Sequence, residues 1–201
     1  MDRESTRWWD WLAVCLLFIA ILVAAERLLA TNWIPHLDYI EFLVALGVIL
    51  GLALGKSQFN RRTVIWLAIG YTLVVVPWQL SQVTADAIGW GERLTSLGGR
   101  LIFSLAQLSS RQPVDDFILF LTFVSILFWL LSIFSAYVLI RYGSILGAVI
   151  PGGLAIIILQ TYDPAVSQRI WFLATYLFLL GAFIIQLGLT IAIGSVIEIN
   201  F

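Results

Sequence analysis

The side chains best suited to covalent catalysis are scarce in this sequence. Cys15 is the only cysteine and His36 the only histidine among the 201 residues. Nucleophilic catalysis needs an activated nucleophile with a base within reach. Cys15 lies within a long apolar run, where a thiol stays neutral and unreactive, and His36 follows Pro35 in the next predicted loop. A cysteine–histidine pair is therefore not expected.

Residues suited to binding a metal ion or a phosphate are also scarce. One cysteine and one histidine do not complete a metal site of the usual ligand count. His36, Asp38 and Glu41 are able to bind a cation weakly, but a solvated loop with interfacial charges explains them more simply. The chain has no GxxxxGK[ST] loop and no GxGxxG after a strand. We therefore predict a protein that is not an enzyme and has no cofactor or resident metal.

The composition indicates where such a chain resides. Hydrophobic residues make up 61% of it and charged residues 11%, with 9 tryptophans and a mean hydropathy of +1.00. A soluble domain is about half apolar and about a quarter charged, so that class is excluded. The net charge of −1 provides no basic surface for nucleic acid. The predicted partner is the lipid bilayer, and no nucleic acid is expected to bind.

Stretches without charged residues locate the predicted helices. A helix needs about 20 mostly apolar residues to cross a ~30 Å hydrocarbon core. The stretches after Arg62, Asp116, Arg141 and Arg169 are longer than this, and two shorter ones before them are extended by flanking aromatic residues that favour the interface. The sequence therefore predicts a single all-α membrane domain over 1–201. It is a helix bundle with six transmembrane helices at about 8–25, 39–55, 63–80, 116–140, 144–160 and 171–195.

Two of these segments have alternative interpretations. The first resembles a signal peptide in that Arg3 and Arg7 precede an apolar run ending in small residues. The second has a short strictly apolar part, which is also typical of a re-entrant segment.

The distribution of basic residues predicts the orientation of the bundle. One side carries Arg3, Arg7, Lys56, Arg61, Arg62 and Arg141. The other side carries Arg27 and Arg169 in short loops, and further arginines in the long loop 81–115. The positive-inside rule for short loops therefore places the N-terminus and the C-terminus in the cytoplasm.

Ionisable groups are almost absent from the predicted spans. Asp10, Glu41 and Asp116 lie within about a turn of a predicted helix end, and Gln186 is the one strongly polar side chain deep inside a span. Because a charge inside the membrane costs several kcal/mol, such residues usually mark transport pathways. The sequence therefore disfavours a proton- or ion-coupled carrier.

A small-residue motif predicts close helix packing. Gly47, Gly51 and Gly55 recur every four residues and share one helical face. In a bilayer such a face lets a second helix backbone approach closely. Ordinary glycine enrichment of membrane helices is the other explanation.

Two further features leave a transport interpretation open. Pro151, Gly152 and Gly153 stand near the centre of the fifth segment, where proline predicts a kink. Broken helices also occur at transporter sites. Ser125 and Ser132 share a stripe of the fourth helix, and such hydroxyls either bond to helices or line a polar path.

The long loop contains an amphipathic helix at about 92–110. Leucines recur at spacings of three and four residues on one face, namely Leu94, Leu97, Leu101, Leu105 and Leu108. Arg93 and Arg100 recur on another face and are expected to point to water or lipid headgroups. The pattern predicts a helix on the outer surface, either in the membrane interface or packed on the bundle or a partner.

The order of features from Gly91 to Pro164 resembles a known family. An outer GERL stretch leads to an acidic start, a tryptophan-centred span, an arginine after it, a short proline-containing span and a YDP exit. This order resembles the N-terminal membrane region of bacterial membrane-anchored transglutaminase-like proteins. In that family several spans precede an extracytoplasmic cysteine-protease-like domain, and a further span follows it.

The resemblance implies a role but no catalytic residue. The family's catalytic Cys, His and Asp belong to the domain that would follow, and no position of this chain matches them. An even number of spans would also require one more span before an outer domain, so we expect this chain to be the membrane half of such a system.

The function expected from the sequence is that of a non-enzymatic membrane module. It would anchor or scaffold an extracytoplasmic domain or partner in the bacterial inner membrane, and we expect a protein partner on the extracytoplasmic face or within the membrane. The alternatives are a small transporter or channel subunit, and an accessory subunit of a larger membrane complex.

Overall fold

The computed structural model describes residues 10–34, 37–84, 89–114, 116–163 and 168–199. These residues form seven helices and no strand, so the predicted all-α fold is confirmed. The helices are α1 (Trp11–Leu29), α2 (Tyr39–Lys56), α3 (Arg61–Thr84), α4 (Trp90–Ser109), α5 (Ile118–Tyr142), α6 (Ile145–Tyr162) and α7 (Trp171–Ile199).

Five helices within the described part of the chain are long and apolar enough to cross a membrane. They are α1, α2, α3, α5 and α6, and each overlaps one predicted span. Helix α7 also begins where the sixth span was predicted and continues to Ile199.

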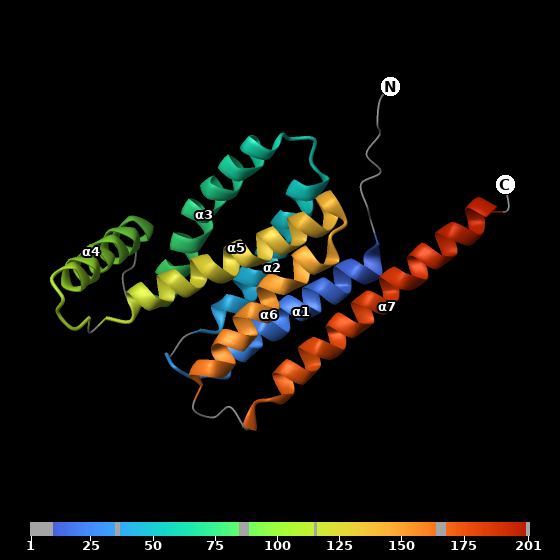
Figure 1. Cartoon of the computed structure of the whole chain (residues 1–201). Coiled ribbons are helices and arrows are strands. Elements are labelled where there is room, and N and C mark those ends of the chain that lie inside the picture. Colours follow the sequence, from blue (N-terminus) through green and yellow to red (C-terminus); the bar gives the residue numbers. More distant parts are fainter. Residues whose placement is uncertain (1–9, 35–36, 85–88, 115, 164–167, 200–201) are drawn as a thin grey trace.

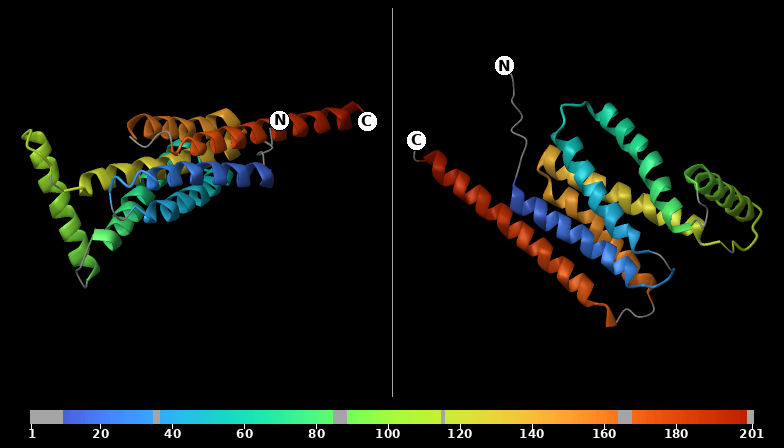
Figure 2. Two further views of the ribbon diagram at one scale, coloured as in Figure 1. Left: turned by 90° about the horizontal axis from the view of Figure 1, so that it is seen from below. Right: turned by 180° about the vertical axis from the view of Figure 1, so that it is seen from behind.

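Helix α5 is the structural centre of the bundle. It packs against α1, α2, α3, α4 and α6, and its interface with α2 is the most extensive in the described structure. Figure 1 shows α1, α2, α5, α6 and α7 running alongside one another, with α3 on one flank. Helix α4 instead lies across one end of the bundle, at a steep angle to the others (Figure 2).

Local hydrogen bonds and one glycine explain where several helices begin and end. The Asp10 carboxylate accepts from the Leu12 N–H at 2.9 Å and caps α1. Gly143 ends α5 in the left-handed conformation, with φ of 61°, which favours glycine. The Ser144 hydroxyl then accepts from the Gly147 N–H and begins α6. This short reversal returns the chain along α5.

The three glycines of α2 all face α5. A Cβ at Gly51 would lie 2.5 Å from the Ile133 carbonyl oxygen and 2.8 Å from the Ala136 Cβ. Equivalent Cβ atoms at Gly47 and Gly55 would meet side chains of α5 at 2.8 Å and 2.9 Å. The two backbones therefore approach more closely along this face than any larger residue permits.

The Pro-Gly-Gly motif lies inside a helix that continues on both sides of it. Helix α6 includes Pro151 and runs to Tyr162. A Cβ at Gly152 would lie 2.6 Å from the Tyr176 hydroxyl, and one at Gly153 would lie 3.2 Å from the Tyr176 ring. The Tyr176 hydroxyl donates to the Val149 carbonyl at 2.5 Å. The glycines therefore make room for a side chain of α7.

We expect Gly51→Leu to destabilise the bundle by about 1–3 kcal/mol, because overpacking forces α2 away from α5. Gly70→Leu is the matched control, since a Cβ at Gly70 meets nothing within 4 Å. Denaturation of the purified chain in detergent measures both variants. Equal stability of the two would show that the α2–α5 contact does not depend on the glycine.

Candidate functional site

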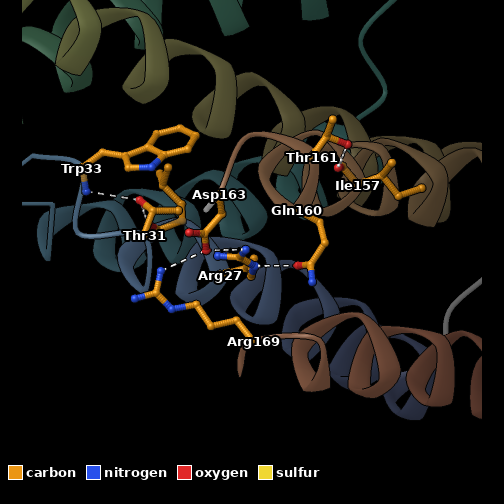
Figure 3. A network of polar contacts seen from close by, with 9 residues as sticks. Arg27, Thr31, Trp33, Ile157, Gln160, Thr161, Asp163 and Arg169 are labelled. Carbon is orange, nitrogen blue, oxygen red and sulfur yellow. Dashed lines mark hydrogen bonds and ion pairs between the residues drawn. The ribbon is translucent and has the colours of Figure 1, made fainter. Parts of the chain in front are cut away.

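A charged cluster is buried where α1 and α6 end together (Figure 3). Arg27 lies in the last turn of α1 and is 0% exposed. Its Nη2 donates to Asp163 Oδ2 at 2.7 Å, and its Nε donates to Gln160 Oε1 at 2.9 Å. Asp163 is the C-cap of α6 and is also buried. The cluster therefore ties the ends of two helices that are distant in sequence.

A second arginine donates a hydrogen bond to the same carboxylate oxygen of Asp163. Arg169, just before α7, donates from Nη1 to Asp163 Oδ2 at 2.9 Å, and its side chain is 24% exposed. The Arg27 guanidinium also lies 5.8 Å from the centre of the Phe172 ring, a cation–π distance. Two arginines and one aspartate thus join α1, α6 and α7, and leave an excess positive charge among these three side chains.

The Arg27 guanidinium retains one hydrogen-bonding group without a partner. Its Nη1 is buried and has no hydrogen-bond acceptor within the described part of the chain. An unpaired buried charge is strongly unfavourable, so the bond to Asp163 must offset a large desolvation cost. The arrangement suits mechanical coupling of helices. It offers no open nucleophile or proton-transfer group.

This cluster corrects the expectation that Arg27 lies in a short loop between two spans. Helix α1 continues past Glu26 to Leu29, so Arg27 belongs to the helix. The sequence does carry a signal, because Leu28 and Leu29 follow the arginine and extend the apolar segment. Its partner Asp163 is 136 residues away, however, and no local pattern connects them.

The Arg93 and Arg100 side chains have tertiary partners that the sequence did not predict. Arg100 donates from Nε and Nη2 to the two oxygens of Asp116, both at 2.7 Å. Arg93 donates to Gln82 Oε1 on α3 at 3.0 Å. Both arginines therefore hold α4 against the bundle while remaining partly exposed, and their predicted contact with water or headgroups stays a prediction.

The Arg100–Asp116 pair fixes one end of α5 against α4. The hydrogen bond from Arg100 lowers the pKa of the Asp116 carboxyl below its usual 3.8. Asp116 also accepts from the Ile118 N–H, the first residue of α5. The acidic residue therefore caps one helix while holding another.

The leucines predicted to share one face of α4 divide between two environments. Leu97 is buried, and Leu94 and Leu101 are half-buried. Leu105 and Leu108 are exposed. The buried side of α4 therefore combines leucines with the arginine contacts, and part of the leucine stripe faces outward.

The serines of α5 are bonded to helices. Ser125 donates to the Leu121 carbonyl at 2.6 Å and shares a 2.7 Å hydrogen bond with the Tyr39 hydroxyl of α2. Ser132 donates to the Phe128 carbonyl of its own helix. Both serines are 0% exposed. These contacts fit helix packing better than a polar path.

The remaining polar candidates form no catalytic or metal arrangement within the described residues. Gln186 donates to Asp10 Oδ2 at 3.1 Å, which ties α7 to the start of α1. No group of three or more His, Cys, Asp or Glu side chains suited to a metal ion occurs there. His36 lies outside the described residues. Cys15 is exposed on α1.

Comparison with known proteins adds no relative. No family model matches the chain, and neither the curated proteins nor the solved structures contain a significant match.

We expect Asp163→Asn to destabilise the protein by about 3–5 kcal/mol, because it leaves the Arg27 charge buried without a counter-ion. Arg27→Met should cost less, since Asp163 keeps its bond to Arg169. Unfolding in detergent measures both, with the exposed Arg62→Gln as control. A larger loss for Arg27→Met than for Asp163→Asn would contradict this account of the cluster.

Proposed function

We propose that this chain is a non-enzymatic integral membrane module that anchors or scaffolds an extracytoplasmic partner. The observation that carries the proposal is the outward side of α4. Ile102 and Phe103 on this helix are 71% and 63% exposed. Helix α4 is not among the helices of the described chain that are apolar enough to span a membrane. Either the membrane interface or a partner would cover its exposed apolar side chains, and we propose that a partner does.

The way α4 is held supports a docking role. Arg93 and Arg100 bond to Gln82 and Asp116, so these two side chains hold α4 against α3 and the start of α5. A helix fixed in this way presents its remaining apolar side chains in a constant position. Preorganised apolar groups of this kind favour binding, because little conformational freedom is lost on association.

The use of polar groups inside the spans also favours a scaffold over a transporter. A carrier built on a broken helix needs polar groups that converge on a shared cavity. Here the Pro151 region is continuous helix, and Ser125 and Ser132 bond to helix carbonyls. The charged Arg27 is fully enclosed and paired.

The partner class follows from the resemblance of residues 91–164. We propose a soluble extracytoplasmic domain of the transglutaminase-like type, which would supply the Cys, His and Asp that this chain lacks. Helix α4 lies within the resembling region, at the end of the bundle where such a domain would sit. The bacterial inner membrane is the corresponding location.

Site-specific photocrosslinking at Ile102 tests the scaffold role. With a benzophenone amino acid at Ile102, we expect a discrete protein adduct in native cells, identified by mass spectrometry as a soluble domain. The control position is Trp66 on α3, which is 72% exposed on a spanning helix and should contact lipid. Adducts with lipid alone at both positions would overturn the proposal.

We also propose that the N-terminus faces the cytoplasm. The Arg141 guanidinium donates to the Ser57 carbonyl at 2.8 Å, so two basic segments share one end of the bundle. In a Cys15→Ala background, an impermeant thiol reagent added outside should label Asn32→Cys and Thr161→Cys. It should spare Ser57→Cys and Ser144→Cys until the membrane is opened. The reverse pattern would invert the orientation.

A further inference from the structure

A narrow apolar groove of about 220 Å³ lies between α6 and α7. Its lining includes Leu146, Ile150 and Ile157 from α6 and Leu177 from α7. Tyr176 also lines it, but its hydroxyl is already donated to the Val149 carbonyl. The groove therefore offers its occupant apolar contact and no free polar group from Tyr176.

The Pro-Gly-Gly motif shapes this groove. Gly153 is part of its lining, and a Cβ there would meet the Tyr176 ring at 3.2 Å. Pro151 contributes no backbone N–H to the same stretch of α6. Tyr176 occupies the space beside these glycines, so its ring and Gly153 together line the groove at this level.

The groove is long enough to take part of an acyl chain that lies along the helices. From Leu146 to Ile157 its α6 wall spans eleven residues, about 16 Å at a rise of about 1.5 Å per residue. One leaflet contributes about half of a ~30 Å hydrocarbon core. Since α6 runs from Ile145 to Tyr162, an acyl chain that enters from the Asp163 end occupies the Ile157 half of this groove.

The excess positive charge of the buried cluster lies beyond one end of this groove. Asp163 is six residues after Ile157, about 9 Å further along the chain direction of α6. Arg169 is partly exposed there, and Arg27 adds a second positive charge behind the same carboxylate. The headgroup layer occupies about 5–8 Å on each side of the core. The cluster therefore lies at the depth of a lipid phosphate.

From these observations we infer that the α6–α7 groove binds one acyl chain of an anionic phospholipid whose phosphate pairs with Arg169. The apolar lining selects hydrocarbon, and the excess charge of the Arg27–Asp163–Arg169 cluster selects an anionic over a zwitterionic headgroup. Exposed Tyr162 and Trp171 flank the headgroup position, as aromatic residues do at membrane interfaces. The inference concerns the isolated chain and does not depend on an extracytoplasmic partner.

Native mass spectrometry of the delipidated full chain in detergent tests this site. The probes are palmitoyl-oleoyl phosphatidylglycerol and the phosphatidylcholine with the same acyl chains. We expect the wild-type chain to bind phosphatidylglycerol about fivefold more tightly than phosphatidylcholine. Arg169→Gln should remove this preference, Arg169→Lys should keep it, and Arg62→Gln at the other end of the bundle should not change it.

A groove-filling variant tests the acyl-chain half of the site. Leu177→Trp places a larger side chain in the groove and should weaken binding of both lipids about tenfold. Leu73→Trp, at an exposed leucine of α3 outside the groove, is the matched control and should have no effect. Equal affinity of the wild type for the two lipids, or equal behaviour of the two tryptophan variants, would overturn the inference. Dimerisation that only Leu177→Trp abolishes would overturn it too, since a second copy would then fill the groove.

Discussion

The close approach of α2 to α5 is the contact on which the rest of the bundle depends. Lipid removes most of the hydrophobic drive for helix association, so packing and hydrogen bonds must hold spanning helices together. At Gly51 the backbone of α5 lies so near that even a methyl group would collide with the Ile133 carbonyl. Because α5 also contacts α1, α3, α4 and α6, its position relative to α2 determines where those helices pack.

Ion pairs between charged side chains also hold the helices together. Arg27, Asp163 and Arg169 join three helices at one end, and Arg100 with Asp116 joins α4 to α5. A buried ion pair is weak evidence for stability, since its desolvation offsets much of its attraction. Its stronger effect is to disfavour arrangements in which either charge lacks its partner. The cluster therefore contributes mainly to the uniqueness of the α1–α6–α7 arrangement.

The positions of the helices could be predicted from sequence because the length of a charge-free segment is a local property of the chain. That length can be compared directly with the thickness of a membrane. The existence of α4 was also predictable, since its leucines repeat with helical spacing. Its orientation was not, because Arg93 and Arg100 acquire their partners Gln82 and Asp116 only in the folded chain. Arg27 was predicted to lie in a loop for the same reason. Its burial depends on Asp163, and a residue next to a predicted span ordinarily reaches water.

We propose that the buried Arg27–Asp163 pair serves to hold α1 and α6 together. Replacing both residues with apolar ones, in the double variant Arg27→Met with Asp163→Leu, tests this most directly through unfolding in detergent. Apolar replacement of a buried pair is often neutral or stabilising. We expect a folded double variant that is more stable than Asp163→Asn and still yields the α4 crosslink. A double variant as unstable as Asp163→Asn, or one that folds but loses the crosslink, would contradict it.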